Sequence, residues 1–85
     1  MKTENEVSHY PVDAEFERQV HNWFTYHAPQ GDQADRYQIL RDEARELAFL
    51  ICKIVPPGAD RTAAIRKLRE CIMTANAAIA CEVVK

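Results

Sequence analysis

The chain has 85 residues, of which 47% are hydrophobic and 28% charged, with a net charge of −2 and only two glycines. A chain this short forms one domain with a thin core, and its apolar content argues against disorder and favours self-association. The negative charge argues against a general nucleic-acid binder. No stretch resembles a membrane span or a signal peptide, so we expect a cytosolic protein.

The first predicted element is a short helix that follows a polar arm. Residues 1–12 are polar, contain Pro11 and show no period, so we expect them to be flexible, with one helical domain over residues 13–85. Asp13 is a good N-cap, and an apolar stripe at helical spacing follows it, which predicts a helix over 14–25. The stripe consists of Phe16, Val20, Trp23 and Phe24.

Two longer helices are predicted over 33–55 and 60–83, on either side of the Pro-Pro-Gly turn at 56–58. Asp32 and Asp60 stand where N-caps are expected. Apolar residues recur in steps of three and four, the pattern of helices that pack along each other, and the short link requires the two to run antiparallel. The seam residues are Tyr37, Leu40, Ala44, Leu47, Ile51 and Ile54 on the first, and Ile65, Leu68, Ile72, Ala75 and Ile79 on the second.

The predicted fold is therefore all-α, a short N-terminal helix plus a long antiparallel helical hairpin. Apolar residues also lie outside the seams, as in TANAAIACE at 74–82. A helix that is apolar over most of its circumference has to be buried on more than one side. We expect this hairpin to pack tightly against the first helix or a neighbouring subunit, and to assemble into a homo-oligomer.

The three cysteines predict packed, reduced thiols. Cys71 and Cys81 are ten residues apart and the three histidines lie far upstream, whereas zinc ligands on one helix face stand three or four residues apart. Cysteine, histidine and carboxylate residues show no catalytic spacing either. We therefore expect no metal, no cofactor and no catalytic residue.

The open end of the predicted hairpin gathers polar and aromatic residues. Antiparallel helices bring Gln33 and Arg36 near Asn76, with the aromatic stretch WFTYHAP at 23–29 folded over the same end. Rings can stack on a nucleic-acid base, and a helix N-terminus binds anions. Alternatively, the rings plug the open end as a small core. Composition alone leaves both interpretations open.

Six of the seven arginines lie in the second part of the chain, from residue 33 to residue 85. Arginine presents a planar pair of donors that match a phosphate group, which lysine cannot do. The same arginines can also be the solvated faces of two helices, paired with acidic residues nearby.

Two motifs bound the hairpin. The first, YHxPxxxQxxRY, stands here as Tyr26, His27, Pro29, Gln33, Arg36 and Tyr37; the second, MTANAAIA, runs from Met73 to Ala80. With these motifs at this separation, residues 25–80 resemble the helical-hairpin domain shared by phage anti-CBASS protein two and the C-terminal part of Thoeris anti-defence protein one. The β-rich N-terminal part of the Thoeris protein has no counterpart in this sequence, so ligand preferences tied to it do not transfer.

The resemblance implies a non-enzymatic sponge that sequesters cyclic oligonucleotide immune messengers in the cytosol of an infected bacterium. It implies homo-oligomers, commonly hexamers, with pockets between subunits for cyclic di- or trinucleotides or a cyclic ADP-ribose derivative, and no membrane or DNA partner. The candidate ligand-binding residues are Phe24, Thr25, Tyr26, His27, Gln33, Arg36, Tyr37 and Asn76, with Arg61, Arg66 and Arg69 for a second phosphate pocket.

One alternative to the sponge is a small helical oligomeric interaction module that binds a host protein through the first helix or the acidic arm. A DNA-binding regulator is disfavoured, because the net charge is negative and the two long helices lack helix-turn-helix spacing.

Overall fold

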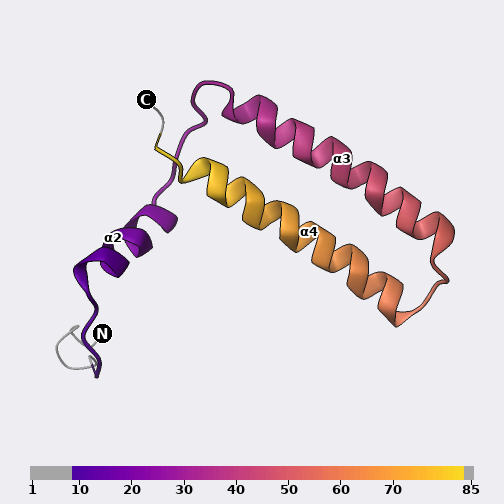
Figure 1. Ribbon diagram of the computed structural model, residues 1–85, viewed down its shortest axis with the longest axis horizontal. Coiled ribbons are helices and arrows are strands. Elements are labelled where there is room, and N and C mark those ends of the chain that lie inside the picture. The colour runs from indigo at the N-terminus through magenta and orange to yellow at the C-terminus, as the bar shows by residue number, and fades with distance from the viewer. Residues whose placement is uncertain (1–8, 84–85) are drawn as a thin grey trace.

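The computed structural model describes residues 9–83, and that part of the chain contains three helices and no strand. Helix α2 spans Ala14–Trp23, α3 spans Gln33–Ile54 and α4 spans Ala59–Ala80. Helices α3 and α4 run antiparallel as a hairpin, and α2 extends away from its open end (Figure 1). The all-α fold predicted from the sequence is confirmed. Residues 1–8 of the expected arm lie outside the described residues.

Helix α2 begins as predicted and ends two residues early. The backbone N–H of Phe16 donates to the Asp13 carboxylate at 2.9 Å, which confirms the N-cap. At the other end, the Thr25 hydroxyl donates to the His21 carbonyl. That carbonyl would accept from the Thr25 backbone N–H if the helix continued, so the side chain replaces the next helical bond and α2 stops at Trp23.

Of the two predicted N-caps of the long helices, Asp32 does stand at the N-cap position of α3, whereas Asp60 does not cap α4. Asp32 makes no capping bond, because its carboxylate pairs with Arg36 instead. Helix α4 begins one residue earlier than expected, so Gly58 takes the N-cap position and Asp60 lies inside the first turn, where its charge still favours the helix dipole. The described helices also end earlier than predicted, α3 at Ile54 and α4 at Ala80.

The seam between α3 and α4 follows the prediction on one helix and departs from it on the other. All five predicted seam residues of α4 are half-buried. On α3, Leu47 and Ile54 are exposed, while Ala48 and the C-cap residue Val55 are half-buried in their place. A straight helix turns every 3.6 residues and drifts away from a 3.5-residue repeat, which accounts for the shift by one position.

No hydrophobic side chain among the described residues is fully buried. Helix α2 does not pack along the hairpin (Figure 1), so the expected tight packing against the first helix is not found within one chain. The ring plug is not found either, because Phe24 is 84% exposed and Trp23 is 55% exposed. The radius of gyration is 18.4 Å, whereas a compact domain of this length would have about 12 Å.

Candidate functional site

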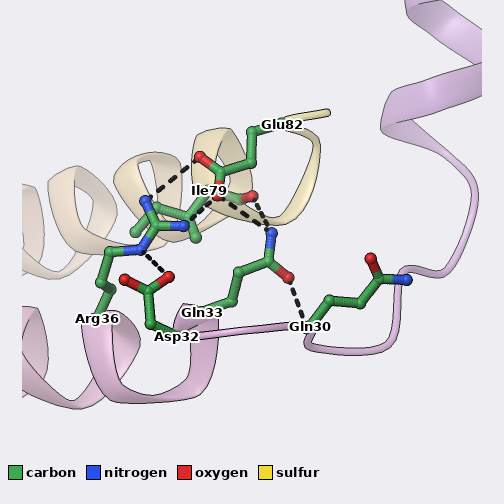
Figure 2. Close-up of polar contacts among 6 residues, drawn as sticks. All are labelled: Gln30, Asp32, Gln33, Arg36, Ile79 and Glu82. Carbon is green, nitrogen blue, oxygen red and sulfur yellow. Dashed lines mark hydrogen bonds and ion pairs between the residues drawn. The ribbon is translucent and has the colours of Figure 1, made fainter. Parts of the chain in front are cut away.

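Gln33, the first residue of α3, is the one buried residue in the described part of the chain, with 2% of its surface exposed. Its amide nitrogen donates to the Ile79 carbonyl at 2.9 Å and lies 3.4 Å from a Glu82 carboxylate oxygen. Its amide oxygen accepts from the Gln30 backbone N–H at 2.8 Å. One side chain therefore joins the loop before α3 to the end of α4 (Figure 2), and the predicted meeting of these two ends is confirmed at Gln33.

Arg36 lies one turn further along α3 and is bound by two carboxylates. Its Nε donates to Asp32 at 3.1 Å, and both terminal nitrogens donate to Glu82 (Figure 2). The hydrogen bond to Glu82 is the main cause that raises the pKa of Arg36 above its ordinary value. The same bond is the main cause that lowers the pKa of Glu82. Both groups are thus charged at neutral pH, and the guanidinium is already occupied by anions of the same chain.

A second set of contacts fixes the loop after α2 against the end of α4. The Asn22 side chain donates to the Cys81 carbonyl at 3.1 Å, and the Nε2–H of His27 donates to the Asn22 carbonyl at 2.8 Å. His27 therefore orients the loop through its Nε2, while the rest of the ring stays available at the surface of the recess described next.

The loop and the helix ends enclose a small polar recess of about 180 Å³. Three of the predicted ligand-binding residues line it, namely Tyr26, His27 and Gln33. The Tyr26 ring is 85% exposed. The other lining residues are Ala28, Gln30, Ala80 and Glu82. The recess combines an exposed ring, amides and a carboxylate held by Arg36, which suits hydrogen bonding and stacking.

The remaining predicted site residues are not part of this recess. Thr25 uses its hydroxyl to end α2, and Phe24 projects into solvent. Tyr37 is half-buried, as predicted for the first seam residue of α3. Asn76 lies in a different place, a larger groove of about 550 Å³ on the hairpin, where its side-chain oxygen is buried without a partner among the described residues.

The three arginines of the predicted second pocket do come together. They line one recess of about 410 Å³ near the closed end of the hairpin, together with Cys52, Thr62 and Ile65. Arg61 donates to the Cys52 carbonyl at 3.3 Å, whereas the described residues offer Arg66 and Arg69 no carboxylate within ion-pair distance.

Sequence reasoning missed Glu82, whose carboxylate accepts from both Gln33 and Arg36 at the open end. A signal for it exists. Glu82 stands three residues after Ile79, about one turn on, and the antiparallel hairpin sets that turn opposite Arg36. An acid at this place in a chain otherwise rich in alanine could have been matched to the arginine across the hairpin.

Within residues 9–83, no group of three or more histidine, cysteine or carboxylate residues is arranged to hold a metal ion. No helix of this described part has both the length and the apolar character that crossing a membrane requires.

Comparison with protein families matches residues 17–80 to the Acb2/Tad1 hairpin domain. The chain belongs to the Acb2/Tad1 hairpin-domain family. The matched region covers most of the chain and includes the hairpin, the loop before it and most of α2. The resemblance seen in the sequence is thereby confirmed. No curated protein and no solved structure matches this member of the Acb2/Tad1 family.

Proposed function

We propose that this protein sequesters cyclic oligonucleotide messengers of bacterial immunity and keeps them from their effectors, as a phage-encoded sponge in the host cytosol. Two findings support this. The chain belongs to the Acb2/Tad1 hairpin-domain family. The observation that carries the proposal is that the opening motif places Tyr26, His27 and Gln33 around one recess at the open end of the hairpin.

Each lining group has a suitable role. The exposed Tyr26 ring offers a face for a base, and stacking of this kind contributes about 1–3 kcal/mol per base. The His27 ring and the Gln33 amide offer polar contacts to a base edge or a ribose. Arg36 offers a charged donor pair for a phosphate, which would take the place of the Glu82 carboxylate.

The recess is too small for a whole messenger. Its volume is about 180 Å³, whereas pockets that enclose a drug-sized ligand have roughly 300–1,000 Å³. A recess of this size can take a single base at most, and the rest of a cyclic di- or trinucleotide then extends toward another subunit. We therefore propose a homo-oligomer, with a hexamer as the family resemblance implies, in which ligand pockets form between subunits. Four predicted site residues do not line the recess and would contact a ligand only where a neighbouring subunit brings them beside it. They are Phe24, Thr25, Tyr37 and Asn76.

The recess lined by Arg61, Arg66 and Arg69 is the proposed second pocket. Symmetry-related copies of these guanidinium groups around an axis would match a ligand that repeats its phosphates in the same way. The proposed function is binding alone, so the messenger should be recovered chemically unchanged from the protein.

Thermal unfolding with a panel of cyclic di- and trinucleotides and a cyclic ADP-ribose tests the proposal. A bound ligand at a hundredfold excess over its dissociation constant stabilises the protein by about 2.7 kcal/mol. Arg36→Ala should weaken binding roughly ten-fold or more, since it removes a charge-assisted contact. The matched control is Arg18→Ala, at an exposed arginine on α2, which should leave affinity unchanged.

The outcomes separate the sponge from an interaction module that binds a host protein. An interaction module should show no change in unfolding temperature with any cyclic nucleotide, and that result would reject the sponge. If Arg36→Ala abolished assembly instead of ligand binding, with helical content retained, Arg36 would be a structural residue.

A further inference from the structure

Helix α2 carries an apolar ridge that the described part of its own chain leaves largely uncovered. Phe16 is 47% exposed and Trp23 is 55% exposed, and their rings meet edge to face with centroids 6.0 Å apart. At 100° per residue, Glu15 and Glu17 fall on opposite sides of this ridge. The helix is thus an apolar ridge with a carboxylate on each flank.

A helix of ten residues has marginal stability in water on its own, because helix nucleation is unfavourable and a short helix forms few hydrogen bonds to offset it. Most helical stability in proteins comes from packing of an apolar face against a partner. Helix α2 has its N-cap bond from Phe16 to Asp13 but no such packing within the described chain. Its apolar ridge therefore needs a partner.

The hairpin presents a groove of complementary character. The groove has a volume of about 550 Å³ and a mainly apolar floor that includes Ile65, Leu68 and Ile72. Arginines line it from both helices: Arg41 and Arg45 come from α3, and Arg69 comes from α4.

The two surfaces match in length and charge. Ten residues of α2 make a helix about 15 Å long. The groove runs from residue 65 to residue 76 of α4, a rise of about 17 Å. An apolar ridge with carboxylates on both flanks faces an apolar floor with guanidinium groups on both walls. We propose that α2 of one copy docks into the hairpin groove of a second copy, with Phe16 and Trp23 on the floor.

The second copy is the occupant because α2 is held away from the groove of its own chain. The Asn22 side chain is bonded to the Cys81 carbonyl, and the His27 ring is bonded to the Asn22 carbonyl. These contacts fix the C-terminal end of α2 at the open end of the hairpin, from which the helix points outward (Figure 1). Docking into its own groove would require α2 to turn back and break them. The inference concerns how copies meet and does not depend on any ligand.

Charge reversal on each surface tests the interface without nucleotide. Protein carrying Glu15→Arg and Glu17→Arg, or protein carrying Arg41→Glu and Arg45→Glu, should sediment mainly as a 9.8 kDa monomer. The wild type should sediment as an oligomer at the same concentration. The four residues are exposed, and circular dichroism checks that each variant stays helical. Matched controls are Arg18→Glu on α2 and Lys67→Glu on α4, two exposed residues that do not line the groove; both should keep the wild-type mass.

Mixing the two reversed proteins distinguishes docking between copies from docking within one chain. In the mixture, each reversed helix meets a reversed groove and each native helix meets a native groove, so association should return to within a few-fold of wild type. Docking within one chain would leave both variants monomeric after mixing, and that result would overturn the proposal. A monomeric wild type, or reversed variants with wild-type mass, would also overturn it.

Trp23 gives an independent measurement because it is the one tryptophan of the chain. Its fluorescence should shift to longer wavelength when wild-type protein is diluted below its association range, since the ring leaves the apolar groove for water. Dissociation without such a shift would show that copies meet elsewhere. If assembly behaves as proposed and no cyclic nucleotide binds, the interface stands and the sponge function fails, so the two proposals are tested separately.

Discussion

The open end and the middle of the hairpin are built in opposite ways. At the open end, polar groups find partners within the chain: Gln33 bonds to Ile79 and Gln30, and Arg36 is bound by two carboxylates. In the middle, an apolar groove stays open, and the side-chain oxygen of Asn76 is buried there without a partner in the described chain.

One chain therefore satisfies the polar groups of its open end by itself, whereas its apolar groove remains available to another molecule. Buried polar groups stabilise a structure only when they are hydrogen-bonded, and the open end meets that condition around Gln33. The groove does not meet it within the described chain, because the side-chain oxygen of Asn76 has no hydrogen-bond partner there. A hairpin without a fully buried apolar side chain therefore holds its open end together mainly by hydrogen bonds and offers its apolar surface for association.

The largest effect should follow from Gln33→Leu. Leucine is of similar size but leaves the Gln30 N–H without its acceptor, and it removes one of the donors to the Ile79 carbonyl. Each hydrogen bond contributes about 0.5–1.5 kcal/mol to stability, and two are lost here. We expect the free energy of unfolding, from urea titration at fixed protein concentration, to fall by about 2 kcal/mol.

The control is Gln38→Leu, a change at an exposed glutamine of α3 whose side chain donates to Asp42 in the next turn. It should change the free energy of unfolding by less than about 0.5 kcal/mol. Equal losses for both variants would mean that the network at Gln33 has no special part in holding the open end, and the comparison of the two regions would break down.

A smaller effect is expected from Glu82→Gln, which keeps the shape of the side chain and removes its charge. The Arg36 hydrogen bond lowers the pKa of Glu82 below its ordinary value of 4.5. The ionised group therefore stabilises the fold above about pH 4.5, and this contribution is lost as the pH falls through the lowered pKa. Wild type should lose more stability than the variant between pH 5 and pH 3, as measured by thermal unfolding.

Glu82→Gln also tests whether the open end of the hairpin binds a ligand. A phosphate that binds Arg36 has to displace the Glu82 carboxylate, so Glu82→Gln should bind cyclic nucleotides several-fold more tightly than wild type at neutral pH. Asp42→Asn, at an exposed acid away from the recess, is the control. Weaker binding by Glu82→Gln would show that the glutamate holds the site in shape rather than competing for it.

Much of the hairpin could be predicted because its signals are local or repetitive. The steps of three and four along α4 predicted its half-buried face correctly, and Asp13 caps α2 as its residue type suggested. The prediction for α3 was wrong by one position at Leu47 and Ile54, since the actual helix keeps 3.6 residues per turn. Asp32 was assigned a capping role, but Arg36 four residues later competes for the same carboxylate.

The candidate site was predictable in part. The pairing of Gln33 with the end of α4 follows from a short link and two equal helices, and the structure confirms it. Asn76 was placed at the same end from sequence, yet it lines the groove with Arg41 and Arg45 instead. Helix phase decides this: a position one turn before Ile79 lies on a neighbouring strip of the surface, and a phase error of one residue is enough to move a side chain from one recess to another.

The smallest effect on the stability of one chain should come from Asn76→Leu, a change in the apolar groove in the middle of the hairpin. Replacing a buried acceptor that lacks a partner by an apolar side chain of similar size removes an uncompensated polar group. We expect the free energy of unfolding of dissociated protein to stay within about 0.5 kcal/mol of wild type or to rise, in contrast to Gln33→Leu. A loss comparable to that at Gln33 would mean that the Asn76 oxygen has a hydrogen-bond partner within one chain, and the contrast between the two regions would fail.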